Sequence, residues 1–256
     1  MPLPTNEQIA AWVGQHIGEF HAKRLINLGA LDLRKLLKRK NPYLFRAKNV
    51  LSASDIVVTL LDAHLSSQEE TLFGDFLEKL AVWINAAVFS GRKSSTIGID
   101  LEFDRDGIRY VLAIKSGPNW ANSSQIRAMR SSFLKARQAL RTGDNPNLHV
   151  EAINGCCYGR CETDCGDYRK LCGQSFWSFI SGSDSLYTDI VEPLGHQAAE
   201  RDEAFRAEYA KVVNRFTGEL IADFCDPDGA LDWERLLKFN SGRDGLKLPK
   251  RLRQPV

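Results

Sequence analysis

The residue types best suited to chemistry lie between positions 98 and 125, where charged side chains interrupt alternating apolar ones. Residues 97–104 alternate as a strand does, which places Asp100 and Glu102 on one face. A second alternating run, 108–115, ends in Lys115 and follows the turn-forming residues 104–107, so the two runs predict a β-hairpin. The carboxylates and the ammonium group then share a face, a combination that suits metal-assisted cleavage of a phosphodiester. The apolar face of the first run comprises Ile97, Ile99, Leu101 and Phe103.

Hydrolysis of a phosphodiester near neutral pH requires an activated water and relief of charge on the phosphoryl oxygens, both of which a divalent metal provides. Mg²⁺ prefers oxygen ligands and keeps several waters, so one or two carboxylates suffice. We expect Asp100 to be the principal ligand, with the backbone carbonyl of Ile114 completing the shell. Lys115 would orient or help to deprotonate the attacking water and stabilise charge on the phosphate. Glu78 is the second expected acidic ligand.

Glu78 belongs to a long predicted helix. We expect this helix to begin at Ser66 or Ser67, because Ser67 and Glu70 fit a capping box and apolar residues follow at helical spacing. Glu70, Gly74 and Glu78 then share one face, where the missing side chain of Gly74 permits a close approach. The capping box accounts for Glu70, whereas Glu78 is either an ordinary exposed glutamate or a ligand.

Length and charge bound the possible classes of protein. With 256 residues, 43% of them hydrophobic and 26% charged, the chain can bury a sizeable core in one large domain. No apolar run approaches the ~18 residues of a membrane helix, and the N-terminus lacks a signal-peptide core, so a cytoplasmic location without membrane contact is expected. The net charge of +2 hides a basic segment, 33–54, that contains no acid. This segment indicates a polyanionic partner.

Two basic segments are candidate DNA contacts. In the first, Pro42 breaks the helix and aromatic residues alternate with cations, so the segment is either a solvated connector or lies along a phosphate backbone. The second is a polar loop, 116–122, that enters a helix capped by Ser123 or Ser124. That helix has an arginine face and no acid between 123 and 142. The expected DNA contacts are Lys40, Arg46, Lys48, Asn119, Trp120, Asn122, Ser123, Arg127 and Arg130.

Five of the six cysteines lie between Cys156 and Cys172. In the cytoplasm they should be reduced thiols or metal ligands, not disulfides. Gaps of three, three and six residues do not match paired CxxC motifs, so buried free thiols are favoured over a zinc site. If zinc is bound, its ligands would be Cys157, Cys161, Cys165 and Cys172. Around this segment we expect a strand at 148–153, an aromatic core segment at 173–180, a helix at about 196–222 and a basic tail from Arg235.

The order Glu78, Asp100, Lys115 and the segments KNPYLFRAKN, EETLFGDFLE, GIDLEF and IKSGPNWANSSQI resemble type II restriction endonucleases of the PD-(D/E)xK superfamily, in the PmeII-like group. The resemblance spans roughly residues 40–185. It implies an α/β fold with a restriction-endonuclease-like core, a mixed central sheet flanked by helices, and helical N- and C-terminal additions. It also implies Mg²⁺-dependent cleavage of double-stranded DNA by a homodimer at a palindromic site, and a companion DNA methyltransferase. Asp100 and Lys115 correspond to the motif aspartate and lysine.

This resemblance divides the chain into three predicted parts within one compact domain. Residues 1–65 would be a helical, basic, DNA-contacting region, residues 66–185 the nuclease core, and residues 186–256 a helical region with a basic tail. The sequence departs from the motif in two places, because Ile99 replaces the proline and Ala113 replaces the usual acid. The missing carboxylate would come from Glu78, Glu102 or Glu70, in that order of preference. Gln125 would also line the site, as polar residues on the following helix do in related nucleases.

Three other interpretations remain open at this point. The same active site could serve a DNA repair or junction-resolving nuclease, because the catalytic groups do not specify which DNA structure is presented. The chain could instead be a non-catalytic DNA-binding module whose Ala113 marks a decayed site. Finally, Asp100 and Lys115 could be a structural ion pair across the hairpin.

Overall fold

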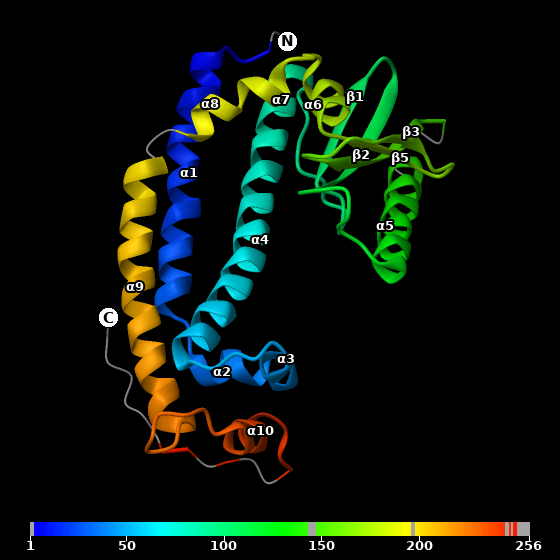
Figure 1. The fold of residues 1–256 in the computed structure, drawn as a ribbon. Coiled ribbons are helices and arrows are strands. Elements are labelled where there is room, and N and C mark those ends of the chain that lie inside the picture. The colour runs from blue at the N-terminus through cyan, green and yellow to red at the C-terminus, as the bar shows by residue number, and fades with distance from the viewer. Residues whose placement is uncertain (1–2, 143–146, 196–197, 244–245, 247, 250–256) are drawn as a thin grey trace. The chain divides into compact units, whose positions relative to one another are not determined.

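A computed structural model describes the chain except for residues 1–2, 143–146, 196–197, 244–245, 247 and 250–256 (Figure 1). The chain divides into two compact units. We call the unit of Met1–Phe20 and Glu70–His196 the sheet unit, and the unit of His21–Glu69 and Gln197–Val256 the helical unit. None of the helices in the described part of the chain combines the length and hydropathy of a transmembrane span.

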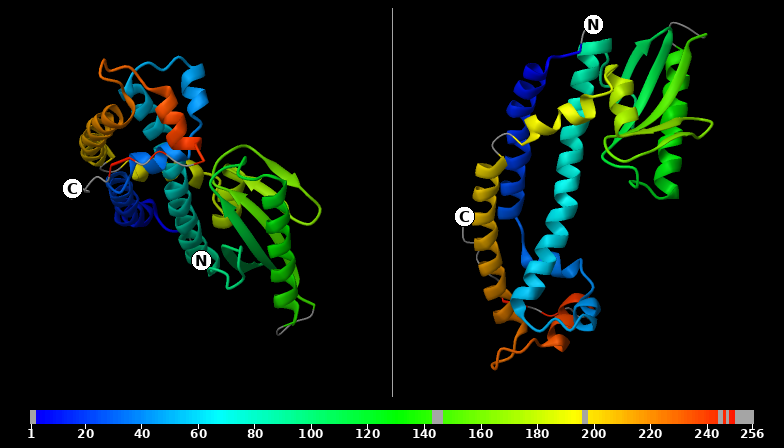
Figure 2. Two further views of the ribbon diagram at one scale, coloured as in Figure 1. Left: turned by 90° about the horizontal axis from the view of Figure 1, so that it is seen from below. Right: turned by 45° about the horizontal axis from the view of Figure 1, so that its top comes forward.

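A five-stranded mixed sheet forms the centre of the sheet unit. Its strands are β1 (Leu101–Arg105), β2 (Ile108–Lys115), β3 (His149–Cys156), β4 (Glu162–Asp164) and β5 (Arg169–Cys172), in the order β1-β2-β3-β5-β4. β2, β3 and β5 are parallel neighbours, whereas β1 and β4 pair antiparallel at the edges. Parallel pairing of β2 with β3 requires a crossover, which α5 (Ser123–Thr142) supplies (Figures 1 and 2). The predicted α/β fold with a mixed sheet flanked by helices is confirmed.

The predicted hairpin is β1–β2. Its turn is made by Asp106 and Gly107, which have φ angles of 53° and 76° and so form the two-residue, left-handed type of turn that suits twisted strands. The prediction that alternation begins at Ile97 is wrong. Ile97 is 91% exposed, and Ile99 packs on the face opposite to Leu101. The strand starts at Leu101. The residues before it form a loop, in which alternating apolar side chains do not share a face.

Helices cover both faces of the sheet. On one face, Met129, Phe133 and Ala136 of α5 pack against a cluster that includes Val111 and Ala113 of β2. The other face is covered by α6 (Gln174–Ser181), by the sheet-unit part of α4 (Ala53–Phe89) and by the first residues of α1 (Asn6–Gly29). Burial of apolar side chains on both faces is the main source of stability, about 25 cal/mol per Å² removed from water. The β2 residues of the second face, as the alternation predicts, are Ile108, Tyr110, Leu112 and Ile114.

The predicted start of α4 at Ser66 or Ser67 is wrong. The helix begins at Ala53, and the Ser52 hydroxyl accepts a hydrogen bond from the Asp55 amide at 3.1 Å. Apolar residues buried in the helical unit continue the helical pattern through the two serines, and neither glycine nor proline interrupts it. Glu70 therefore lies within a continuous helix and has no capping role.

The remaining helices are short, except for α9. They are α2 (Leu33–Lys38), α3 (Pro42–Ala47), α7 (Leu186–Asp189), α8 (Val191–Leu194), α9 (Ala198–Phe224) and α10 (Trp233–Ser241). α1 ends at Gly29, and α2 follows it as a separate helix. Pro42 does more than break a helix, because it is the first residue of α3 and Asn41 caps it. Of the predicted basic tail, Lys247, Lys250, Arg251 and Arg253 lie outside the described residues.

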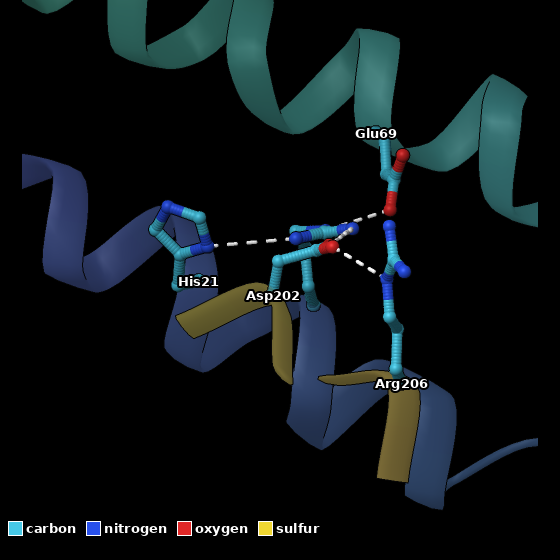
Figure 3. A network of polar contacts seen from close by, with 5 residues as sticks. His21, Glu69, Asp202 and Arg206 are labelled. Carbon is cyan, nitrogen blue, oxygen red and sulfur yellow. Dashed lines mark hydrogen bonds and ion pairs between the residues drawn. The ribbon is translucent and has the colours of Figure 1, made fainter. Parts of the chain in front are cut away.

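A polar network joins α1, α4 and α9 within the helical unit (Figure 3). Arg24 Nε lies 2.6 Å from Glu69 Oε1, and Arg24 Nη2 lies 4.0 Å from Asp202 Oδ1. Asp202 also pairs with Arg206 on the same helix at 2.7 Å. Burial, and next the charge of Arg24, lower the pKa of His21, so this imidazole is neutral at pH 7. The network links the three helices. Its two arginines balance its two carboxylates, so it carries no net charge near neutral pH.

Arg34, one of the cations of the basic segment, has a structural role. Its Nε and Nη2 donate to the two carboxylate oxygens of Asp223 at 3.0 and 3.2 Å, and Asp223 is only 2% exposed. A two-pronged bond to a buried carboxylate is strong, because the carboxylate has little water to replace it. Arg34 is therefore not counted among the candidate DNA contacts.

We predict that Arg34→Met lowers the free energy of unfolding by about 3 kcal/mol, because it removes a charge partner from a buried carboxylate. Arg206→Met is the matched control. Arg206 is 80% exposed and pairs with Asp202 four residues before it, so its loss should cost below ~0.5 kcal/mol. Urea unfolding followed by circular dichroism measures both. Equal costs for the two variants would contradict a structural role for Arg34.

Candidate active site

Asp100 lies just before β1, at the point where the pairing of β1 with β2 ends. Its amide donates to the Leu112 carbonyl at 2.8 Å, and its carboxylate oxygen Oδ2 accepts from the Ile114 amide at 2.7 Å. The side chain thus takes the place of the next backbone acceptor in the ladder. Because the amide and carbonyl of a strand residue point to the same side, the Ile114 carbonyl oxygen faces the side on which Asp100 lies.

Lys115, the last residue of β2, lies beside this carboxylate. Its Nζ is 3.7 Å from Asp100 Oδ2 and 5.5 Å from the centre of the Trp120 ring. The structure thus brings Asp100 and Lys115 together, as the hairpin predicts. Both side chains are partly exposed, so the pair can exchange its mutual contact for an incoming ion or phosphate.

A buried asparagine on β3 supports the lysine. Asn154 donates from Nδ2 to the Ala113 carbonyl at 3.2 Å and accepts from the Trp120 indole at 3.2 Å. Asn154 is buried, so both bonds are made away from water and fix the indole relative to β2. Trp120, predicted as a DNA contact, is half-buried and forms one wall beside Lys115.

Glu78 reaches the same place from α4. Burial, and next the negative charge of Asp100, raise the pKa of Glu78, while Lys93 and Lys115 oppose that shift. Repulsion between two carboxylates has this effect on a pKa when the groups are near neighbours. Glu78 Oε1 also accepts from Lys93 Nζ at 3.3 Å. A cation bound between neighbouring carboxylates relieves such repulsion.

Gly74 allows α4 to approach the sheet, as predicted. A Cβ at this position would lie 3.3 Å from the Ser116 Cβ, which is tighter than ordinary van der Waals contact. The absence of a side chain therefore lets the helix pack against the residue that follows Lys115. Glu78, one turn further along the same helix, is brought toward Asp100 by this close approach.

The other candidate acids have different surroundings. Glu102 is buried, and its carboxylate pairs with Arg92 at 2.7 Å and accepts from the Ser94 hydroxyl at 3.2 Å. These partners compete with any metal for its oxygens. Glu70 instead lines a cleft of about 1010 Å³ with Phe73, Ser116 and Tyr158, among others. Glu78, whose pKa is raised in part by the charge of Asp100, remains the preferred candidate for the second acidic ligand.

Ala113, the position of the missing acid, is fully buried against α5. A carboxylate there would lose much of its hydration, a cost that the small apolar side chain avoids.

Gln125, which is predicted to line the site, belongs to a helix cap. The predicted caps of α5, Ser123 or Ser124, are wrong, because Asn122 accepts from the Ser124 and Gln125 amides at 3.0 and 3.1 Å. Gln125 Oε1 in turn accepts from the Asn122 amide at 2.9 Å, which completes a capping box. Asn122 and Gln125 therefore hold the start of α5 directly after β2 and the loop that follows it.

The remaining predicted DNA contacts are mostly exposed. Arg130 pairs with Asp167 at 3.3 Å, and Arg46 lies over the Trp233 ring at 5.6 Å. Lys40 is half-buried. Besides Arg46 and Arg130, the exposed members of the set are Lys48, Asn119, Asn122, Ser123 and Arg127.

The structure does not bring the four candidate zinc ligands together. Cys165 packs with the cluster under α5, whereas Cys157 belongs to the cluster on the opposite face of the sheet. Cys172 and Cys161 are neighbours, since the Cys172 amide donates to the Cys161 carbonyl at 2.8 Å. Among the described residues, no group of three or more His, Cys, Asp or Glu side chains is arranged to hold a metal ion. Burial, first of all, raises the pKa of Cys157, which is therefore a neutral thiol.

Two residues of the site are not apparent from the sequence. Lys93 lies in the loop between α4 and β1, where an exposed lysine carries no periodic signal. Cys157 donates from its amide to the Lys115 carbonyl at 3.0 Å, and the charges of Glu78 and Lys115 both affect its pKa. The thiol belongs to a segment whose only sequence signal was its cysteine content.

The donor set fits a hard divalent cation. Asp100, Glu78 and the Ile114 carbonyl all present oxygen, and the two carboxylates are close enough for one to raise the pKa of the other. Mg²⁺ prefers such oxygen ligands and completes its shell with water.

Carboxylates, a carbonyl and a lysine gathered at the end of a strand of an α/β sheet define the class of sites that can carry out metal-assisted phosphoryl transfer. Comparison with known families is consistent with this class. The family described as Type II restriction endonuclease EcoO109I matches residues 7–202, most of the 256-residue chain. The chain therefore belongs to this family of type II restriction endonucleases, which implies an endodeoxyribonuclease with DNA as its substrate. No match was found among curated proteins.

We predict that Glu78→Gln weakens binding of Mn²⁺, used as a probe for Mg²⁺, to the DNA-free protein by at least ~10-fold. The reason is that the substitution removes one of two acidic ligands. Glu102→Gln and Glu70→Gln are matched controls on the two rival acids and should weaken binding by less than ~2-fold. The electron paramagnetic resonance signal of free Mn²⁺ gives all three affinities. A larger loss for Glu102→Gln than for Glu78→Gln would reverse the assignment.

Proposed function

We propose that the protein is a Mg²⁺-dependent type II restriction endonuclease of the PD-(D/E)xK superfamily, in the PmeII-like group. It cleaves both strands of DNA at a short palindromic site. The observation that carries this proposal is the junction of Asp100, the Ile114 backbone and Lys115, with Glu78 beside it. This arrangement gathers oxygen ligands and an ammonium group at the end of β2.

Each residue of the site would have its own role in hydrolysis. Asp100, Glu78 and the Ile114 carbonyl would hold Mg²⁺, which supplies charge relief on the phosphate and a more acidic water. Lys115, close to Asp100, orients the attacking water and balances charge on the phosphoryl oxygens. Trp120, held by Asn154, limits the positions that the lysine can take.

The DNA-contacting surface would include the basic segment of the helical unit. This segment holds Lys35, Lys38, Arg39, Lys40, Arg46 and Lys48 without an acid, and the charges of Lys40 and Arg39 contribute, after burial, to the lowered pKa of His64. Clustered cations attract a phosphate backbone without reading its sequence. We therefore retain the functional division into a DNA-contacting region (1–65), a nuclease core (66–185) and a C-terminal helical region (186–256).

A homodimer is the assembly that fits a palindromic site, because a two-fold axis in the DNA is matched by one in the protein. Each subunit would cut one strand. Cleavage of double-stranded DNA also requires protection of the host's own sites. A DNA methyltransferase acting on the same sequence would provide that protection, without needing to contact the nuclease.

Asp100→Ala and Lys115→Ala should each reduce Mg²⁺-dependent plasmid cleavage by about 10²-fold or more, because they remove a ligand and a charge-stabilising group. Asp104→Ala and Arg109→Ala are controls on the same hairpin, where this pair is joined by a 2.7 Å bond near the turn. The controls should cut at close to the wild-type rate. Cleavage is followed on agarose gels, and run-off sequencing of the ends gives the site. Wild-type activity in either Asp100→Ala or Lys115→Ala would refute their roles.

Lys48→Ala and Arg127→Ala should each lower the slope of log affinity against log salt by about 0.9, because each removes one phosphate contact. Both side chains are exposed. Lys211→Ala is the control, since Lys211 is exposed on α9 and pairs with Glu208 at 3.1 Å. Fluorescence anisotropy with labelled duplex DNA in Ca²⁺ measures the slopes. Slopes identical to that of the control variant would show that these residues do not contact phosphates.

A further inference from the structure

Two ammonium groups flank the carboxylate pair of the candidate site. Lys115 Nζ lies 3.7 Å from Asp100 Oδ2, and Lys93 Nζ lies 3.3 Å from Glu78 Oε1. Each carboxylate thus has its own cation, and the four charges balance. Lys93 is 71% exposed, so its side chain can leave Glu78 at little cost in packing.

The backbone on either side of Lys93 is held in place. Arg92 and Glu102 exchange two backbone hydrogen bonds of 2.9 Å, and the side chains of Arg92 and Ser94 both reach the Glu102 carboxylate. In an extended segment, alternate side chains point to opposite sides. The contacts to Glu102 therefore direct Lys93 to the other side, where Glu78 lies. Glu102 acts as a positioning residue for Lys93.

We propose that Lys93 occupies the place of the divalent cation at Glu78 in the metal-free protein and moves to a DNA phosphate when the cation binds. This inference rests on the proposed function, in which Glu78 is a metal ligand. Lys93 and the divalent cation are both attracted to Glu78 and repel one another, so they compete for it. Once displaced, the ammonium group finds its nearest counter-charge in the phosphate backbone of bound DNA.

The exchange couples the two ligands of the enzyme. A phosphate that accepts Lys93 leaves Glu78 available to the metal, and a metal on Glu78 leaves Lys93 available to the phosphate. Such coupling is reciprocal, so DNA tightens metal binding by the same factor by which the metal tightens DNA binding. The charge balance of the metal-free site thereby disfavours binding of either ligand alone.

The first test is the Mn²⁺ affinity of the DNA-free protein, read from the electron paramagnetic resonance signal of free Mn²⁺. Lys93→Met should bind Mn²⁺ about two- to fivefold more tightly, because the competing cation of an exposed pair is gone. Lys93→Arg, which keeps the charge, should resemble the wild type. Lys79→Met is the matched control, because Lys79 is 52% exposed and lies 3.3 Å from Glu19, the same distance as Lys93 from Glu78. Its Mn²⁺ affinity should not change.

The second test is the salt dependence of binding to labelled duplex DNA that spans a mapped cleavage site. In Ca²⁺, Lys93→Met should lower the slope of log affinity against log salt by about 0.9, which corresponds to one phosphate contact. In EDTA its slope should equal that of the wild type, because Lys93 then remains on Glu78.

The two tests separate this inference from the proposed function. If the wild type binds Mn²⁺ and cuts DNA but Lys93→Met matches Lys79→Met in both tests, the exchange is refuted and the nuclease assignment stands. An equal drop in slope in Ca²⁺ and in EDTA also refutes the exchange, because the phosphate contact would not depend on the metal. If the wild type neither binds Mn²⁺ nor cuts DNA, both proposals fail.

Discussion

The hydrogen bond from the Ile114 amide to the Asp100 carboxylate is the interaction on which the candidate site depends. It lies where the β1–β2 ladder ends, so a side-chain oxygen replaces a backbone acceptor. A buried amide without an acceptor is costly, which gives the carboxylate a structural reason to remain in this position. The same oxygen, Oδ2, faces Lys115. One bond therefore fixes the ligand, the direction of the Ile114 carbonyl and the surroundings of the lysine.

The second carboxylate follows from how α4 packs on the sheet. Ala113 is committed to the apolar layer under α5, so β2 cannot supply an acid at that position without burying a charge. Gly74 lets α4 approach Ser116, and the helix then presents Glu78 near Asp100. Glu78 on α4 lies beside the loop before β1, and Lys93 of this loop pairs with it. The departure from the usual motif is thus accompanied by a second ammonium group at the site.

The hairpin, and with it the proximity of Asp100 and Lys115, could be predicted because both depend on local signals: alternation and turn residues. The proximity of Glu78 to Asp100 could only be proposed, because it depends on how a helix docks on a sheet.

The predicted start of α4 is wrong because Ser67 and Glu70 fit a local cap, while buried apolar residues upstream extend the helix through them. Gln125 and Glu102 were candidates by position on a face, but their oxygens are used by a cap and by an arginine, contacts that no periodicity encodes. The short strands β4 and β5 lie in a segment rich in cysteine and glycine, which hides any alternation.

The most direct test of the central claim, that Asp100, Glu78 and the Ile114 carbonyl together hold the catalytic metal, is anomalous diffraction from crystals of the protein with Mn²⁺ and duplex DNA. The account predicts an anomalous peak in direct contact with oxygens of all three residues, and Lys93 no longer paired with Glu78. A peak on Glu102 or Glu70, or a metal held by Asp100 while Glu78 stays paired with Lys93, would contradict it.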